Sequence, residues 1–203
     1  MSDQYRSRRD EYAEATWLGV VAAARELFGQ AGYSKTTVKE IAKRARVSPA
    51  TVYAQCGGKQ GLLRTLMDAW TAGQLVGEII EACARAEDAS VMLRVLADGY
   101  VAIYESSGDI IRIVTEAAAD TSEAAEFLET ANARHHEALV AIVSEARRTG
   151  QLNKELSDDD AARIIFFHFR FEQFILAADT FKWGTDRARD WIRERVEAAI
   201  LVP

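Results

Sequence analysis

Residues 27–63 read LFGQAGYSKTTVKEIAKRARVSPATVYAQCGGKQGLL, and this stretch decides the fold of the N-terminal region. Glu40 follows Thr37 by three residues, which is the spacing of a capping box at the start of a helix. Ser48 before Pro49 repeats the start signal, because proline lacks the N–H that the first helical position leaves unpaired. The stretch therefore predicts two short helices within residues 37–55, joined by a tight turn.

The two short helices have the spacing of a helix-turn-helix. Ala42 is small enough for the helices to cross closely, and Pro49 and Ala50 leave the outer side of the second helix narrow enough for a DNA major groove. Helix pairs of this kind also occur as purely structural elements in all-α proteins, so the spacing alone leaves both interpretations open. The small core between the helices is predicted to consist of Val38, Ile41, Val47 and Val52.

The distribution of charge favours DNA as a partner of the N-terminal region. The whole chain of 203 residues has a formal net charge of −6, which taken alone argues against nucleic acid. Residues 1–70, however, hold 11 Lys and Arg against 7 Asp and Glu, whereas residues 71–203 hold 14 against 24. Such an asymmetry indicates a nucleic-acid partner for the basic part, although a solvated basic face would give the same count.

The remaining sequence predicts an all-α protein. Apolar residues recur at helical spacing from end to end, and no run combines β-branched residues with strict alternation. One of the expected breaks lies at Ser106-Ser107-Gly108, because serine and glycine disfavour helix interiors. Outside the short pair, helices are expected near residues 12–30, 59–70, 71–85, 90–106, 109–118, 122–148, 157–179 and 185–201.

The opening stretch closely resembles the DNA-binding region of the tetracycline-repressor (TetR) family of transcriptional regulators. The resemblance implies an N-terminal three-helix DNA-binding domain, residues 1–58, with a helix-turn-helix. It further implies a C-terminal helical domain, residues 59–203, that binds a ligand and dimerises through a four-helix interface. The matching elements are Leu27-Phe28, Gly32-Tyr33, Thr36-Thr37-Val38, Ile41-Ala42, Val47-Ser48, Thr51-Val52-Tyr53, Lys59 and Leu62-Leu63.

The resemblance also implies contacts with a double-stranded, palindromic operator. Thr37 is expected to contact a phosphate, and Tyr53 and Lys59 correspond to residues that clamp the phosphate backbone. Because Pro49 and Ala50 carry no hydrogen-bonding side chains, direct readout is expected to use apolar contacts with thymine methyl groups. The full set of expected DNA contacts is Thr36, Thr37, Val38, Lys39, Ser48, Pro49, Ala50, Thr51, Tyr53 and Lys59.

Two positions depart from the family pattern. Arg46 stands in the turn where the family usually has glycine, so it must adopt a left-handed or nearby conformation at a cost of roughly 1 kcal/mol, unless the turn is shaped differently. The segment Gln55-Cys56-Gly57-Gly58 replaces the usual His-Phe type pair before the lysine. Cys56 is expected to fill the buried place of the aromatic residue as a small apolar side chain.

The C-terminal part contains an unusually aromatic segment within the helix expected at residues 157–179. A helix that is apolar on nearly every side must be covered on nearly every side. One face is expected to pack on the protomer's own core and another on a second copy, although a single buried core helix is the alternative. The interface residues expected in the homodimer are Phe167, Phe171, Phe174 and Trp191.

The central helices are where the family binds small molecules. Apolar faces with a few polar tips suit a cavity for a largely apolar, unidentified effector, and the same pattern is typical of an ordinary core. The residues expected to bind the ligand are Leu96, Tyr100, Ile103, Tyr104, Ile111, Val114, Phe127 and His135.

Nothing in the sequence predicts catalysis, a metal site or a cofactor. His135-His136-Glu137 is not a zinc-binding HExxH motif, and the cysteines Cys56 and Cys83 have neither a CxxC setting nor a nearby histidine. The first residues lack an apolar core typical of a secretion signal, and no segment suits a membrane span, so a cytoplasmic protein is expected. Two other classes stay open: an all-α enzyme or sensor with a structural helix-turn-helix, and an architectural DNA-binding protein without an effector.

Overall fold

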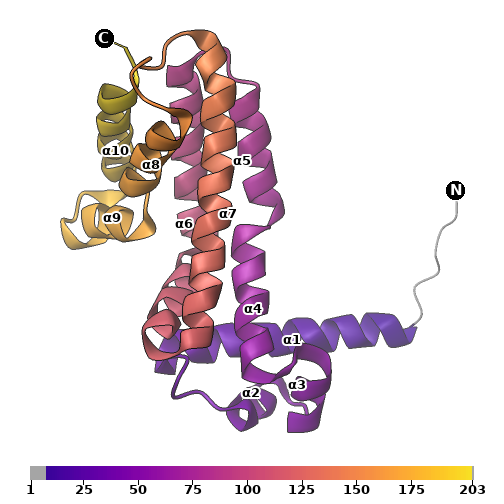
Figure 1. Cartoon of the computed structure of the whole chain (residues 1–203). Helices are drawn as coiled ribbons and strands as arrows, with labels where there is room; N and C mark the ends of the chain where they lie inside the picture. Colours follow the sequence, from indigo (N-terminus) through magenta and orange to yellow (C-terminus); the bar gives the residue numbers. More distant parts are fainter. Residues whose placement is uncertain (1–7, 203) are drawn as a thin grey trace, which may run out of the picture. The chain divides into compact units, whose positions relative to one another are not determined.

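The computed structural model describes residues 8–202, apart from the side chain of Arg9, and these residues confirm the all-α class (Figure 1). One isolated antiparallel bridge joins Leu152 to Leu201. None of the helices in residues 8–202 is long and apolar enough to cross a membrane. The elements are α1 (Arg8–Ala31), α2 (Val38–Ala45), α3 (Pro49–Cys56), α4 (Gly58–Thr71), α5 (Gln74–Ala84), α6 (Ala89–Asp120), α7 (Ser122–Ala146), the 3-10 turn η1 (Arg147–Thr149), α8 (Asp158–His168), α9 (Phe171–Ile175), the π-helical turn η2 (Leu176–Thr180) and α10 (Gly184–Ile200).

The chain packs into two compact units. The first unit runs to Ala69 and also includes Asp109–Leu128, and the second comprises Trp70–Gly108 and the residues from Glu129 onward. Helices α4, α6 and α7 therefore each contribute residues to both units. These units describe packing and differ in extent from the functional domains expected at residues 1–58 and 59–203; that functional division stays a prediction.

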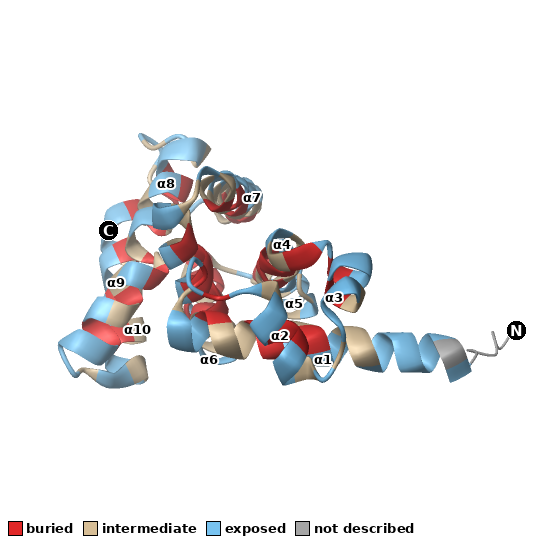
Figure 2. Ribbon diagram, turned by 90° about the horizontal axis from the view of Figure 1, so that it is seen from below, coloured by how far each residue is buried: buried red, intermediate tan, exposed pale blue. Residues whose placement is uncertain are grey.

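The core of the first unit forms where α1, α2 and α3 meet. Val20, Ala24 and Phe28 follow helical spacing on α1 and are almost completely buried, as are Ile41 on α2 and Val52 on α3 (Figure 2). This burial removes one continuous apolar face from water, which is the main favourable term holding such short helices in place.

Polar contacts tie the first segment of the chain to the end of α6. The Arg25 guanidinium donates two hydrogen bonds to the Asp109 carboxylate, from Nε to Oδ2 at 2.6 Å and from Nη2 to Oδ1 at 2.5 Å. The Ser34 hydroxyl donates to Asp120 at 2.6 Å. The fork-shaped Arg25 pair fixes orientation as well as distance, because both bonds must be satisfied together.

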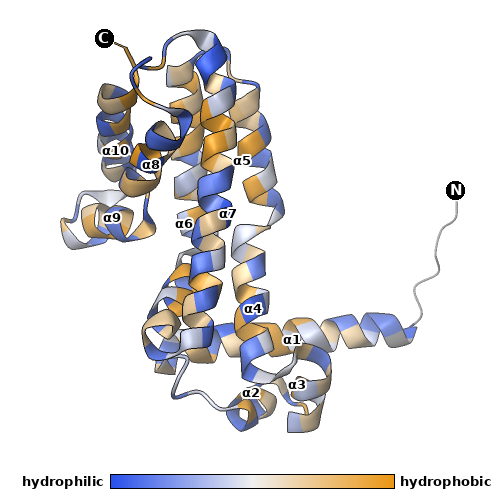
Figure 3. Cartoon of the chain, viewed as in Figure 1, coloured by the Kyte–Doolittle hydropathy of each residue, from blue (hydrophilic) through white to orange (hydrophobic). Residues whose placement is uncertain are grey.

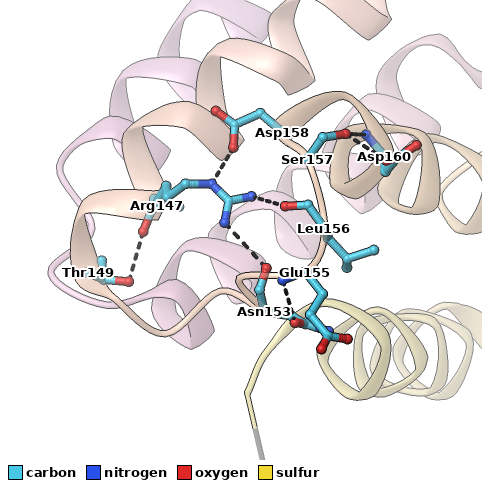
Figure 4. A network of polar contacts seen from close by, with 9 residues as sticks. Arg147, Thr149, Asn153, Glu155, Leu156, Ser157, Asp158 and Asp160 are labelled. Carbon is cyan, nitrogen blue, oxygen red and sulfur yellow. Dashed lines mark hydrogen bonds and ion pairs between the residues drawn. The ribbon is translucent and has the colours of Figure 1, made fainter.

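The second unit is built from α5, the first part of α6, the later part of α7, and α8 to α10. Hydrophobic residues are frequent on α5 and on the upper part of α7 (Figure 3), and the residues buried in this unit include Cys83 on α5, Leu96 on α6 and Leu139 on α7. The link from α7 to α8 is held by Arg147, whose guanidinium pairs with Asp158 and donates to the carbonyls of Leu156 at 2.8 Å and Asn153 at 3.3 Å (Figure 4). The half-buried guanidinium thereby provides a donor for the Leu156 carbonyl and a second donor for the Asn153 carbonyl, which also accepts from the Leu156 N–H.

The break expected at Ser106-Ser107-Gly108 is wrong, because α6 continues through it. Glycine in a helix interior costs only about 1 kcal/mol relative to alanine, which packing on both sides offsets. Gly108 lies against the Tyr104 ring, and Ile110 and Ile111 are buried immediately beyond it. Tertiary packing thus overrides the local preference of this tripeptide.

The single helix expected over residues 157–179 is also wrong in its later part. Helix α8 ends at His168, and Arg170 has extended backbone (φ −61°, ψ 140°) before α9 begins. In a continuous helix Phe169 and Phe171 would point roughly 200° apart, since successive residues turn by about 100°. The break allows both rings to be buried.

Candidate nucleic-acid interface and ligand cavity

The start of α2 is fixed by a complete capping box, as predicted. The Thr37 hydroxyl accepts from the Glu40 backbone N–H at 3.3 Å, and the Glu40 carboxylate accepts from the Thr37 N–H at 2.8 Å. The Thr37 hydroxyl also donates to the Glu40 carboxylate at 2.7 Å, and this bond, with the smaller effect of the Thr37 N–H, holds the pKa of Glu40 below its usual value. The box ends the preceding loop sharply, so that Thr37 and Lys39 are exposed at the N-terminus of the helix.

The turn between the short helices passes through Arg46 in the left-handed conformation (φ 59°, ψ 39°), as the departure from glycine predicted. The Val47 N–H donates back to the Ala42 carbonyl at 2.9 Å, which closes the end of α2. The left-handed residue is what redirects the chain into α3, and an L-side chain adopts it at a cost of roughly 1 kcal/mol.

Helix α3 begins as the Ser-Pro pair predicts. The Ser48 hydroxyl accepts from the Thr51 N–H at 3.0 Å, and Pro49 occupies the first turn. Val52 and Cys56 face the core, whereas Pro49 and Ala50 are exposed and the Tyr53 side chain is 61% exposed. The expected recognition residues therefore share the outer face of this helix.

The side chains of Thr36 and Lys59, two of the expected DNA contacts, donate to backbone carbonyls of the loop before α2. Thr36 is buried, and its hydroxyl donates to the Gly32 carbonyl at 2.9 Å, so it shapes the loop before α2 and presents no surface for a phosphate. The Lys59 ammonium donates to the Tyr33 carbonyl at 2.9 Å and lies 4.3 Å from the centre of the Tyr33 ring. Backbone carbonyls leave the charge of Lys59 uncompensated, so it still contributes positive potential there.

The junction of α3 and α4 depends on a residue that sequence reasoning missed. A Cβ on Gly61 would lie 1.8 Å from the Cys56 carbonyl oxygen, so only glycine allows the two backbones to approach so closely. Cys56 itself is buried, as predicted, and burial raises the pKa of its thiol. A glycine within a helical pattern was the available signal for this close approach.

A cavity of about 380 Å³ lies in the second unit. Its walls come from the end of α4 and from α5, α6, α7 and α9, and are mostly aliphatic and aromatic. Size and lining are those of sites that hold small molecules. The lining residues are Trp70, Thr71, Val76, Ile79, Ile80, Leu96, Gly99, Tyr100, Ile103, Ala131, Arg134, His135, Glu137, Ala138, Leu139, Ile142 and Phe171.

Tyr100 and His135 form a polar pair in the cavity wall. The Tyr100 hydroxyl is hydrogen-bonded to His135 Nε2, and the Tyr100 ring stacks on Phe169 with centroids 4.7 Å apart. Loss of hydration lowers the pKa of His135 to about 4, with Arg170 and His136 adding to the effect, and burial raises the pKa of Tyr100. Both side chains are therefore neutral at neutral pH.

Comparison with known proteins agrees with the geometry of α2 and α3. Residues 20–66, which contain both helices, match the family model described as "Bacterial regulatory proteins, tetR family". This helix-turn-helix region is of the tetR type. The HTH-type transcriptional regulator YvkB of Bacillus subtilis (strain 168) is 39% identical over 62 residues, which are 30% of this chain and 32% of that protein. The A-factor receptor protein of Streptomyces griseus is 32% identical over 60 residues, 30% of this chain and 22% of the receptor.

Solved structures show the same fold over nearly the whole chain. SmeT, the repressor of the Stenotrophomonas maltophilia multidrug efflux pump SmeDEF, in complex with triclosan, is 20% identical with a TM-score of 0.77, over 93% of this chain and 92% of SmeT. A TetR-family regulator from Syntrophomonas wolfei is 14% identical with a TM-score of 0.78, over 92% of this chain and 95% of that chain. The tetR-type fold thus extends beyond the matched N-terminal region.

The residues expected to bind a ligand divide into two groups. Leu96, Tyr100, Ile103 and His135 line the cavity. Tyr104 instead donates a hydrogen bond to Asp179 at 2.6 Å. Ile111 and Val114 on α6 and Phe127 on α7 are buried in the first unit instead and do not line the cavity.

The expected dimer residues also divide. Phe171 and Phe174 are buried within the protomer, where Phe171 packs against Trp70 and Phe174 against Tyr104 at ring distances of 6.1 and 4.9 Å. They offer little surface to a partner. Phe167 and Trp191 are 60% and 44% exposed. The aromatic run in the sequence gave no sign of which rings the break at Arg170 would turn inward.

Proposed function

We propose that this tetR-family chain is a sequence-specific transcriptional regulator that binds operator DNA as a homodimer and releases it when a small molecule binds. The observation that carries the proposal is α3, a capped helix whose exposed outer face begins with Ser48, Pro49 and Ala50. A second helix presented in this way is the element that helix-turn-helix proteins insert into the major groove.

Charge around α3 supports binding to the phosphate backbone. Lys35, Lys39, Lys43 and Arg46 are exposed, whereas Arg44 pairs with Glu26 at 2.6 Å. Cations that contact phosphates release condensed counterions, so the affinity is expected to fall steeply with salt. Pro49 and Ala50 would then distinguish base pairs through apolar contacts such as those with thymine methyl groups.

Exposed apolar side chains on the second unit support a homodimer. Phe167 on α8 and Trp191 on α10 are exposed, and Phe181, in the chain segment between these helices, is 54% exposed. Large apolar side chains gathered on neighbouring elements mark interaction sites more often than isolated ones do. Two helices from each of two copies would form the expected four-helix interface and present two DNA-binding domains to a palindrome.

The cavity supports an effector and argues against an architectural protein with a filled core. Lys59 lies in the first turn of α4, and Trp70 and Thr71 at the end of the same helix line the cavity. A ligand that moves those last residues moves a single stiff helix whose other end adjoins α3. It releases DNA only to the extent that it binds the DNA-free state more tightly.

We propose binding rather than catalysis as the function of this site, and a cytoplasmic location beside the chromosome. Both cysteine thiols are buried with a raised pKa, which suits structural rather than nucleophilic roles. Within residues 8–202, no group of three His, Cys, Asp or Glu side chains could hold a metal ion.

Selection from random duplexes tests the proposed function. The full chain is expected to enrich a palindromic sequence and to bind it with an affinity on the order of 1000-fold above unrelated DNA at physiological salt. Substitution of Ala50 by Arg should change the enriched sequence. The control is substitution of Glu87, an exposed residue outside the helix-turn-helix, by Gln, which should leave the enriched sequence unchanged. Absence of any enriched sequence, with the chain folded, would favour the enzyme or sensor class.

A further inference from the structure

The chemistry of the cavity narrows the class of ligand, on the premise of the proposed function that this cavity receives an effector. Its charged lining residues, Arg134 and Glu137, are both exposed and stand three residues apart on α7, on neighbouring positions of one helix face. The Arg134 guanidinium donates to the Thr71 hydroxyl at 3.2 Å. Opposite charges at this spacing largely cancel, so the exposed edge of the cavity at Arg134 and Glu137, here called its mouth, favours neither a cationic nor an anionic ligand.

The interior of the cavity contains a different kind of polar group. Tyr100 and His135 are neutral, and the other interior walls are apolar, with Trp70 and Phe171 contributing aromatic faces. Arg170, which acts on His135, is itself paired with Glu172 at 2.7 Å. A ligand charge in the interior would therefore lose its hydration without gaining an unpaired counter-ion, and that loss costs several kcal/mol. The interior therefore disfavours both carboxylates and amines.

The hydrogen bond between Tyr100 and His135 determines what the imidazole offers. The phenol is the stronger acid and the imidazole nitrogen the stronger base, so the Tyr100 hydroxyl donates and Nε2 accepts. The proton of the neutral ring then resides on Nδ1, which becomes a hydrogen-bond donor.

The Nδ1 donor of His135 is available to a ligand. Among the described residues no partner bonds to this atom, and none of their polar side-chain atoms is both fully buried and unpartnered. Nδ1 therefore keeps accessible surface, on a side chain that lines the cavity. Phe166 and Tyr100 hold the ring in place at centroid distances of 5.0 and 5.5 Å, so the donor has a fixed direction.

We infer that the cavity selects an uncharged, largely aromatic ligand with a hydrogen-bond acceptor oxygen, which His135 Nδ1 binds while Trp70 and Phe171 pack against the ring system. Aromatic ketones, lactones and ethers have this chemistry. Carboxylates of the same shape lack the required neutrality, and hydrocarbons of the same shape lack the acceptor. His135 acts here as a specificity-determining residue and Tyr100 as the residue that sets its tautomer.

Three probes of nearly identical shape separate these possibilities: 2-acetonaphthone, 2-isopropenylnaphthalene and 2-naphthoate. Dissociation constants are measured by equilibrium dialysis with the full chain at pH 7.5 and without DNA. The ketone is expected to bind about tenfold more tightly than the alkene, which is the value of one hydrogen bond in a dry site. It is expected to bind roughly 100-fold more tightly than the carboxylate, because that charge must be desolvated.

Variants assign the preference to the imidazole. H135L should reduce the ketone-to-alkene ratio to about 1 and leave alkene binding within about twofold. The matched control is H136L, at a neighbouring imidazole that bonds Asp159 at 2.8 Å and does not line the cavity; it should retain the ratio. Y100F keeps the aromatic ring but removes the hydroxyl that holds the His135 proton on Nδ1, and should lower the ketone-to-alkene ratio by about threefold. This variant tests the inference independently of whether H135L folds.

The outcomes separate this inference from the proposed function. Equal binding of ketone and alkene, tighter binding of the carboxylate, no saturable binding of the ketone, or an unchanged ratio in Y100F and H135L would each overturn the inference and leave DNA recognition by α3 untouched. A ketone that binds with the expected ratios but leaves the operator complex intact would support the inference and contradict the effector role.

Discussion

Replacement of Gly61 by alanine tests how α3 is held against α4. The new Cβ would lie 1.8 Å from the Cys56 carbonyl oxygen, over 1 Å closer than such atoms approach in folded proteins. The obstacle is backbone at the end of α3, which no side-chain rotation relieves. The two helices must move apart, and overpacking of this kind costs about 3 kcal/mol.

A gain in helix propensity opposes that cost. Gly61 lies inside α4, where alanine is favoured over glycine by about 1 kcal/mol. We therefore expect G61A to lower the free energy of unfolding by about 2 kcal/mol, the difference between the two effects. The same movement displaces α3, so affinity for operator DNA should fall as well.

Guanidinium unfolding followed by circular dichroism measures the change, with G77A as the matched control. Gly77 lies inside α5 with open space around its Cβ position, so alanine there should raise stability by about 0.5–1 kcal/mol. Opposite signs for the two variants are expected. If G61A proves as stable as the wild-type chain, or more stable, the close approach of α3 and α4 described above is incorrect.

Three further predictions concern single residues. R46G should raise stability by about 1 kcal/mol in thermal unfolding, because glycine adopts the left-handed turn without strain; a loss would mean that the Arg46 side chain has a stabilising partner. K59A should weaken binding to specific and random DNA alike and reduce the slope of log K against log salt by about 1; an unchanged slope would restrict Lys59 to bonding the Tyr33 carbonyl. The folded state favours the neutral form of His135, so its contribution to stability should be complete above about pH 6.5 and should be lost as the pH falls toward the folded pKa of about 4. The free energy of unfolding, measured with urea, should fall by about 2 kcal/mol between pH 7 and 5. The same fall in H135L would show that another group causes it.

The features that could be predicted from sequence are those determined by neighbours along the chain. The capping box at Thr37, the Ser48-Pro49 start and the left-handed Arg46 all depend on contacts within about four residues, and each is present as predicted. The buried place of Cys56 was implied by the resemblance to the tetR family, in which an aromatic residue usually fills it. Local chemistry was therefore sufficient to outline the candidate DNA-reading helix.

The features that escaped prediction depend on where distant segments pack. The apolar positions of α6 have the same spacing before and after Gly108, yet Ile103 lines the cavity and Val114 lies in the core of the first unit. Periodicity identifies a buried face and contains no information on what covers it. Trp70 and Arg134 were missed as cavity residues for the same reason, since each meets the cavity only through its helix's tertiary position.

The continuity of α6 bears on how a ligand would act. A break at Ser106-Ser107-Gly108 would have left the cavity wall at Leu96–Ile103 on one helix and Asp109, the partner of Arg25, on another. In one unbroken helix of 32 residues a displacement at the cavity wall is passed along the helix to the extent that the helix does not bend. On the proposed function, α6 therefore carries the change to α1 through the Arg25 fork, alongside the path through α4. The serine and glycine residues that suggested a boundary lie instead within the element that joins the two units.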